Sequence, residues 1–236
     1  DVAKLAQKKS SLEEVAREAR LKFLFAAAEK YKIRKIALGH NLDDQAETVL
    51  MRVLRGTGLQ GLSGIQPKRA FGKFILVRPL LEIRRSQIRS FLRRKKITPC
   101  YDRSNAQDLY LRNRVRNRLL PLLEREYNKN IKEVLSNLAE SAAADYDYLI
   151  KKAQDSFSRS KGKISLKAIL KQHPALRRIS LRLAIGSLQG NTRRISFRHI
   201  KEIEDLLFSR PVGSIVHLPQ GISVTKKANF LAFSLE

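Results

Sequence analysis

The sequence predicts an α/β fold built around a parallel sheet, followed by a smaller α+β domain. Two observations carry this prediction. In the first half, segments with the apolar spacing of helices alternate with short apolar runs that end at glycine or proline, an order typical of parallel strands covered by helices. After Pro121 the pattern changes to long helical segments followed by strand-like alternation. We therefore expect two domains, residues 1–125 and residues 126–236.

The first half begins with a predicted helix. Ser11 and Glu14 have the spacing of a capping box, in which both side chains accept hydrogen bonds from backbone N–H groups. Apolar residues at helical spacing then continue to about Tyr31. The elements that follow are a strand over 33–38, a helix from about Asp43 to just before Gly56, a strand over 74–77 and a very basic helix over 84–97.

The second half contains three predicted helices and three predicted strands. The helices cover about 129–156, 165–188 and 197–208, because apolar residues recur there with helical spacing. The strands cover 214–218, 222–225 and 230–235, and a Pro-Gln-Gly turn separates the first two. Helices followed by neighbouring strands indicate an α+β domain.

Charge dominates the composition. The chain has 48 Lys plus Arg against 22 Asp plus Glu, a net charge of +26, and a surface this basic attracts polyanions such as nucleic acids. No segment has the roughly 18 uncharged apolar residues of a membrane helix. Cys100 is the single cysteine, so an internal disulfide and a thiolate metal site are excluded. We expect a protein of the cytoplasm that handles RNA, with no membrane partner.

The densest polar cluster covers residues 39–48, where a predicted strand ends and a helix begins. Parallel sheets bind ligands at this end of their strands. Asp44 and Glu47 are three residues apart and share one helix face, with His40 one turn earlier. Two convergent carboxylates suit a Mg²⁺ ion or a substrate ammonium group. Alternatively, Asp43 and Asp44 only complement the positive end of the helix.

Two further segments are candidates for phosphate binding. The loop from Arg55 to Gly64 is rich in glycine, which lets backbone amides approach a phosphate, although a plain connecting loop explains it equally well. Arg112 and Arg116 share one helix face, and Arg114 and Arg118 share another. Arginine binds phosphate through two parallel hydrogen bonds, which lysine cannot do.

The basic helix carries seven Lys or Arg from Arg84 to Lys96. It is either an RNA-binding surface or only a solvated face.

These segments together resemble the tRNA(Ile)-lysidine synthases of the PP-loop (N-type ATP pyrophosphatase) superfamily. The resemblance covers residues 1–125 well, and residues 126–236 look like the first C-terminal domain of that family. It implies the C-terminal part of a Rossmann-like, parallel-sheet PP-loop domain, followed by a tRNA-binding domain. The matching pieces are Ser11-Leu12-Glu13-Glu14 with Arg17 and Arg20, Gly39-His40-x-x-Asp43-Asp44-x-x-Glu47-Thr48, Arg55-Gly56-Thr57-Gly58-x-x-Gly61-Leu62, Arg78-Pro79-Leu80, Asp102-x-Ser104-Asn105, and Arg112-Asn113-x-Val115-Arg116 with Pro121.

The resemblance implies a ligase that uses ATP and Mg²⁺. ATP adenylates the C2 oxygen of the wobble cytidine in the anticodon of a minor isoleucine tRNA and releases pyrophosphate. The ε-amine of free lysine then attacks C2 and releases AMP. Asp44 and Glu47 would bind the lysine and, with Arg112, form the catalytic set. ATP or the adenylate would contact His40, Arg20, Arg112 and Arg116, with help from Arg17. The implied tRNA-binding residues are Arg55, Arg84, Arg85, Arg89, Arg93, Arg94, Arg114 and Arg118.

Two departures from the family pattern affect these expectations. The family's Ser-Gly-Gly-x-Asp-Ser loop, which holds the ATP phosphates, does not occur in residues 1–236, and the chain begins at Asp1 without Met. We therefore expect an N-terminally truncated chain that is inactive without that loop. Leu21 follows Arg20 where the family usually has tyrosine, and this replacement puts little of the resemblance in doubt. The alternatives are another PP-loop enzyme such as a tRNA thiolase, against which the lone Cys100 argues, and a non-catalytic RNA-binding protein. A homodimer is compatible with the sequence.

Overall fold

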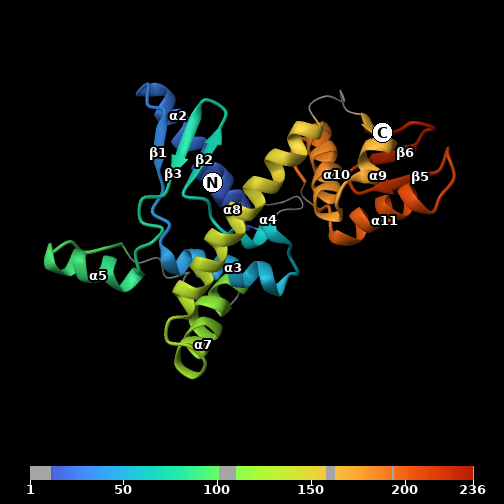
Figure 1. Cartoon of the computed structure of the whole chain (residues 1–236). Helices are drawn as coiled ribbons and strands as arrows, with labels where there is room; N and C mark the ends of the chain where they lie inside the picture. Colours follow the sequence, from blue (N-terminus) through green and yellow to red (C-terminus); the bar gives the residue numbers. More distant parts are fainter. Residues whose placement is uncertain (1–11, 101–109, 158–162, 193, 236) are drawn as a thin grey trace. The chain divides into compact units, whose positions relative to one another are not determined.

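The structure is a computed structural model that describes residues 12–100, 110–157, 163–192 and 194–235. It divides into two compact units, Asp1–Ala143 and Ala144–Glu236, coloured from blue to yellow and from yellow to red in Figure 1. The division falls inside the long helix α8 (Ile131–Phe157). The domain boundary near residue 125 stays a prediction. Two predicted features, the capping box at Ser11 and the segment 102–105, lie outside the described residues.

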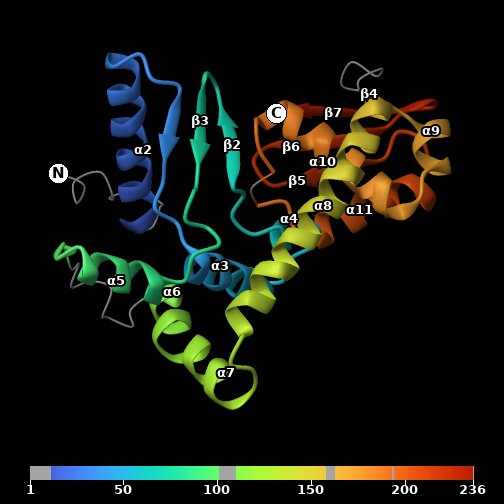
Figure 2. The same cartoon turned by 60° about the vertical axis from the view of Figure 1, so that its left-hand side comes forward.

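The sheet of the first unit contains the two predicted strands and a third that the sequence analysis missed. β1 (Lys35–Ala37) and β3 (Phe74–Val77) pair in parallel, as expected. β2 (Lys68–Phe71) adds an antiparallel strand on the far side of β3. The helix α2 (Leu12–Lys30) lies along β1 in Figure 2. The core of this layer contains Ala28, Ile36 and Leu76. The α/β prediction is confirmed, with a mixed sheet instead of a purely parallel one.

Three helical segments that lie after β1 in the chain belong to the first unit. The helix α3 (Leu42–Leu54) follows β1 after a short loop, and α4 (Leu59–Leu62) and α5 (Arg85–Arg94) come later. A continuous helical stretch is built from α6 (Leu111–Arg114), the π-helical turn η2 (Val115–Leu119) and α7 (Leu120–Glu126). Its buried residues pack against α3 and the start of α8, and the shared core contains Ala46, Val49, Val115, Leu120, Leu135 and Ala139.

The π-helical turn has a local cause in the sequence. Pro121 lies at the start of α7 and has no N–H to donate to the preceding helical turn. Just before it, the backbone N–H of Leu120 donates to the carbonyl of Val115, five residues back. Single π-turns of this kind occur often at functional sites. Here the turn follows Arg112 and contains Arg116, two residues of the candidate site described below.

The second unit is the predicted α+β domain. Its elements are β4 (Lys163–Ser165), α9 (Leu166–Lys171), α10 (Pro174–Gln189), α11 (Phe197–Phe208), β5 (Ile215–Leu218), β6 (Ile222–Lys226) and β7 (Phe230–Leu235). The antiparallel sheet has the order β4-β7-β6-β5, and the core joins that sheet to the helices α9, α10 and α11. The prediction of a single helix over 165–188 is wrong. The structure has two helices there, because Pro174 starts a new helix with His173 as its N-cap.

No helix within the described ranges combines the length and the apolar character needed to cross a membrane.

Candidate active site

The start of α3 positions the predicted carboxylates. Asn41 caps the helix by accepting a hydrogen bond from the N–H of Asp44 (3.1 Å), and the Asp44 carboxylate accepts one from the N–H of Asn41 (3.1 Å). This reciprocal capping fixes the first turn of the helix. The alternative role for Asp44, as a helix-end residue, is therefore real. The same side chain, however, also has a second set of partners.

Asp44 and Glu47 form one cluster with three arginines from two other segments. Arg112 Nε lies 2.9 Å from Glu47 Oε2, and Arg112 Nη2 lies 3.2 Å from Asp44 Oδ1. Arg116 binds both oxygens of Glu47, at 2.6 and 2.8 Å, and also reaches Asp44 Oδ1 at 3.2 Å. The structure thus brings together the three residues predicted to be catalytic, and adds Arg116.

Arg85, at the start of α5, completes this cluster. Its Nη2 atom lies 3.1 Å from Asp44 Oδ1 and 3.1 Å from Glu47 Oε1. Whereas Arg112 and Arg116 each use two nitrogen atoms, Arg85 contacts the two carboxylates through one nitrogen only. The resemblance predicts that Arg85 binds tRNA, and the sequence contains no signal of this contact, because a run of basic residues is equally typical of a solvated helix.

Burial makes Glu47 the centre of the cluster. Glu47 has 0% of its surface exposed. Burial alone would raise its pKa, but the hydrogen bonds and positive charges of Arg116 and Arg112 outweigh this effect and hold the pKa below its ordinary value. Glu47 is therefore ionised at neutral pH. Three guanidinium groups face two carboxylates, so the cluster retains net positive charge and favours a nearby anion.

Asp43 connects the same helix to α5 and α8. Its carboxylate accepts a hydrogen bond from the backbone N–H of Arg85 (2.7 Å) and lies 3.2 Å from Lys132 Nζ. Burial alone would raise the pKa of Asp43, but the Arg85 N–H and Lys132 outweigh it and lower the pKa. Lys132 also binds Glu124 at 2.9 Å. The start of α5 is thus fixed to α3 by both its backbone and its Arg85 side chain.

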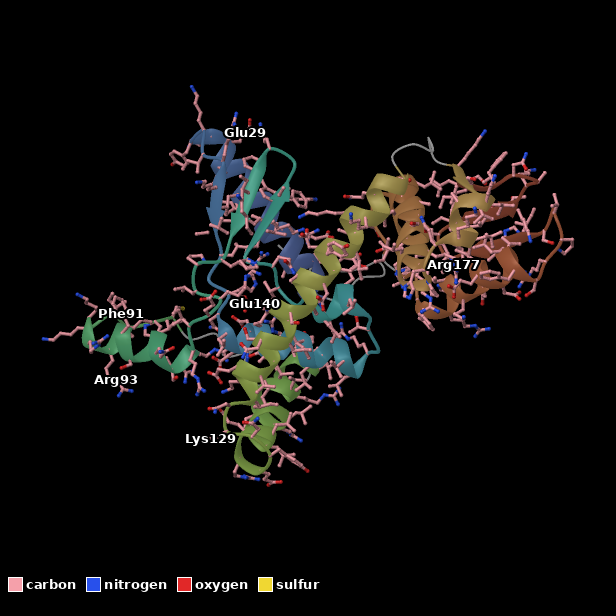
Figure 3. The ribbon with its side chains drawn as sticks, viewed as in Figure 1. Glu29, Phe91, Arg93, Lys129, Glu140 and Arg177 are labelled. Carbon is pink, nitrogen blue, oxygen red and sulfur yellow. The ribbon has the colours of Figure 1, made fainter. Side chains whose placement is uncertain are left out.

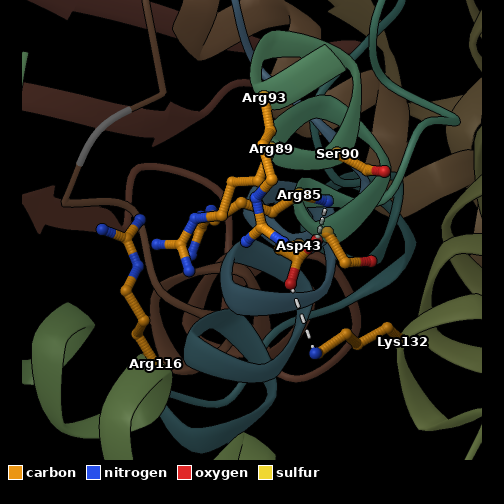
Figure 4. Close-up of a pocket in the computed structure, with 8 residues that line it drawn as sticks. Asp43, Arg85, Arg89, Ser90, Arg93, Arg116 and Lys132 are labelled. Carbon is orange, nitrogen blue, oxygen red and sulfur yellow. Dashed lines mark hydrogen bonds and ion pairs between the residues drawn. The ribbon is translucent and has the colours of Figure 1, made fainter. Parts of the chain in front are cut away.

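A basic groove of about 490 Å³ lies beside the cluster. Figure 4 shows Arg85, Arg89 and Arg93 extending from α5, with Arg116 and Lys132 on the neighbouring helices. Among the described residues of its lining Asp43 is the one acidic residue, and Ser86 and Ser90 add hydroxyl groups. Arg85 and Arg116 belong both to this groove and to the carboxylate cluster. The groove is therefore continuous with the candidate site.

The residues predicted to bind ATP are only partly brought together. His40 lies just before α3, and its Nδ1 accepts a hydrogen bond from Arg78 Nε (3.3 Å). Arg78 is 7% exposed, and the Arg-Pro-Leu motif was the signal for it in the sequence. Arg20 is exposed on α2, and none of the cluster contacts above involves it. The side chain of Arg17 lies outside the described residues.

The remaining predicted tRNA-binding arginines differ in their surroundings. Arg84 forms an ion pair with Glu133 of α8. In Figure 3, Phe91 and Arg93 lie on opposite sides of α5. The exposed members of the predicted set are Arg55, Arg89, Arg93, Arg94, Arg114 and Arg118. Only Arg85, Arg89 and Arg93 line the groove.

The glycine-rich loop is held by the protein itself. Arg52 donates to the carbonyls of Gly61 (2.6 Å) and Gly64 (2.9 Å). Gly64 has φ +59°, and a Cβ atom there would lie 2.5 Å from Gln45 Oε1, so only glycine fits without a shift. The backbone N–H groups of residues 61–64 donate to carbonyls within the loop, so they are not directed at a phosphate. The structure therefore favours the connecting-loop interpretation over a phosphate-binding one.

The described residues do not fit a metal ion held by the protein alone. Among them, no group of three or more His, Cys, Asp or Glu side chains gathers as a metal site would require. Asp43, Asp44 and Glu47 are each paired with Arg or Lys instead.

A family model of the PP-loop domain matches residues 1–123, so the chain belongs to the PP-loop family. The names of similar proteins are more specific than the name of the family. The chain is similar to the tRNA(Ile)-lysidine synthases of Clostridioides difficile (35% identical over 96% of this chain and 50% of the relative) and Geobacter sulfurreducens (38%, 95% and 48%). A third, from Caldanaerobacter subterraneus subsp. tengcongensis, is 34% identical over 94% of this chain and 48% of its own length. The chain spans about half the length of the curated relatives it matches.

Proposed function

We propose that this chain carries the lysine-transfer site of an ATP-dependent ligase that joins free lysine to the wobble cytidine of a minor isoleucine tRNA. The names of the relatives support the substrate class. The observation that carries the proposal is the Arg85 nitrogen between the two carboxylates, 3.1 Å from each. A cation with a single nitrogen is what the ε-ammonium of lysine presents.

This geometry supports lysine binding. A free ε-amine has a pKa of about 10.4, so at neutral pH it is almost wholly an ammonium ion. An ammonium at the position of Arg85 Nη2 would donate hydrogen bonds to Asp44 and Glu47. Arg112 of α6 and Arg116 of η2 bind the same two carboxylates and would keep their oxygens in place. Arg85 would turn into the neighbouring groove, where its guanidinium can meet a phosphate.

ATP and the adenylate need positive charge nearby. The cluster has one more guanidinium than carboxylate, and phosphate charge is stabilised by arginines already held in position. We assign this role to Arg112 and Arg116, and to His40, which Arg78 orients. The location of the reaction would be the cytoplasm, where tRNA and ATP are available.

The basic groove is the proposed surface for the tRNA backbone. Replacing Arg89 or Arg93 with Ala should weaken tRNA binding and reduce the slope of log K against log salt by about 0.7–0.9 for each phosphate that the variant no longer binds. Arg94→Ala is the matched control, because it removes the same charge from α5 outside the groove lining. Filter binding across a salt series measures both quantities. Equal effects of all three variants would show that only net charge matters.

The function itself is tested by ATP-dependent incorporation of labelled lysine into a minor isoleucine tRNA, using the protein that carries residues 1–236. The product should gain the mass of one lysine less one water, and omission of ATP should abolish the gain. Binding of tRNA without any mass change would favour a non-catalytic RNA-binding protein. A gain of sulfur instead of lysine would identify a thiolase.

A further inference from the structure

One face of α11 in the second unit carries two aromatic side chains with two charged side chains between them. Phe197, Lys201, Glu204 and Phe208 follow one another at spacings that place them on the same side of the helix. The two rings are eleven residues apart, which corresponds to about 16 Å along the axis. We call this row, together with Arg177 and Arg178 of α10, the α11 stripe.

Glu204 holds the two arginines of α10 in place. Its carboxylate lies 3.3 Å from Arg177 Nε, 3.1 Å from Arg178 Nε and 3.1 Å from Lys201 Nζ. Glu204 is 4% exposed. Three cations on one buried carboxylate leave two positive charges uncompensated within the stripe. An arrangement that served only to join α10 and α11 would not need this excess.

The same arginines lie against the two rings. The Cζ atom of Arg177 is 4.7 Å from the centroid of the Phe208 ring, and that of Arg178 is 5.1 Å from the centroid of the Phe197 ring. Each ring is therefore covered on one face by a guanidinium group. Phe197 is nevertheless 58% exposed and Phe208 56% exposed, so a large part of each ring remains open to solvent. Rings that only filled the core would be buried.

We infer that the α11 stripe binds unpaired RNA, with bases stacked on Phe197 and Phe208 and the connecting phosphates facing Lys201 and Arg178. Every base has a π-face, and positive charge beside an aromatic platform is the usual arrangement for single-stranded nucleic acids. A partner of this chemistry fits the excess positive charge of the stripe, as an apolar or basic partner does not. The inference deepens the proposed function, which makes RNA the substrate of this chain.

Tryptophan substitution gives a direct test, because the chain contains no tryptophan. Phe197→Trp and Phe208→Trp each place a single fluorescent indole in the stripe of the full chain. A short single-stranded RNA should quench both, and a blunt RNA duplex should not. Phe230→Trp is the matched control: Phe230 also lies under a cation, Lys163 Nζ at 4.9 Å, but it belongs to β7 and not to the α11 stripe.

The effect on affinity is measured with leucine variants, which stay apolar but cannot stack. Phe197→Leu and Phe208→Leu should each weaken binding of the single-stranded RNA by about 5- to 150-fold, the range for removal of one base–aromatic stack. Thermal melting should show that both variants remain folded. Arg198→Ala, which removes an exposed cation of α11 that is paired with Glu202, should have a much smaller effect.

Two outcomes would overturn the inference: RNA that binds with unchanged indole fluorescence at both positions, or quenching by an acidic polypeptide and not by RNA. Neither readout requires ATP or lysine. Quenching without lysine incorporation would therefore reject the proposed function and support RNA binding by the α11 stripe. Lysine incorporation without quenching would support the proposed function and reject RNA binding by the stripe.

Discussion

Replacing Glu47 with Gln is expected to destabilise the first unit by about 3 kcal/mol, because the change removes the charge that three arginines share. Removing one partner of a buried ion pair costs about 3–5 kcal/mol. The lower end applies here, since the side chains of Arg85, Arg112 and Arg116 keep 21–26% of their surface exposed and can turn partly to water. Urea unfolding at neutral pH, followed by circular dichroism, measures this loss.

Glu29→Gln is the matched control for that measurement. Glu29 also forms an ion pair in the first unit, with Lys73, but its side chain is 58% exposed and that of Lys73 is 62% exposed. Exposed pairs contribute less than about 1 kcal/mol, so this variant should unfold almost like the wild type. Similar losses in both variants would show that the arginine cluster adds nothing to stability beyond an ordinary surface pair.

The pH dependence of the Glu47 contribution has a defined sign. The folded-state pKa of Glu47 lies below the ordinary value of 4.5, so its contribution is fully present above that value and is lost as pH falls through the folded-state pKa. The difference in unfolding free energy between the wild type and Glu47→Gln should therefore be constant from neutral pH down to about pH 5.5 and shrink below pH 4.5. A difference that grew in acid would contradict this account.

The elements with strong local signals were predictable from the sequence. Phe197 to Phe208 has a capping Ser196 and regular apolar spacing, and the predicted helix has the same bounds as α11. The strand β2 was missed because all four residues from Lys68 to Phe71 are exposed, so no alternation of buried and exposed positions marks it. The helix start at Pro174 was overlooked although proline is common there.

The candidate site was predictable only where its residues lie close together in the sequence. The spacing of Asp44 and Glu47 indicated convergent carboxylates, and the structure places them together. Arg85 was not recognised as part of the cluster because its contact depends on how α5 packs on α3, and Lys132 was assigned to the other domain. The assignment of these residues to lysine, ATP and tRNA stays a prediction.

The second prediction with a large effect concerns lysine. Asp44→Asn should raise the lysine concentration needed for half-maximal ligation by roughly 10- to 150-fold, which corresponds to the loss of one charge-assisted hydrogen bond. Arg85→Gln should not raise it, because the guanidinium between the carboxylates competes with the ammonium. Arg85→Gln should instead weaken tRNA binding, since Arg85 also lines the groove. The two variants thus separate lysine binding from tRNA binding.

The central claim, that Asp44 and Glu47 receive the lysine ammonium in place of Arg85, is tested most directly by lysine saturation of ATP-dependent ligation at saturating tRNA. The measurement compares the wild type, Asp44→Asn and Arg85→Gln of the protein that carries residues 1–236, with the tRNA Kd of each determined in parallel. The account predicts a much higher lysine requirement for Asp44→Asn with an unchanged tRNA Kd, and an equal or lower lysine requirement for Arg85→Gln. An unchanged lysine requirement in Asp44→Asn, in an active and folded enzyme, would contradict it and leave Asp44 as a helix cap alone.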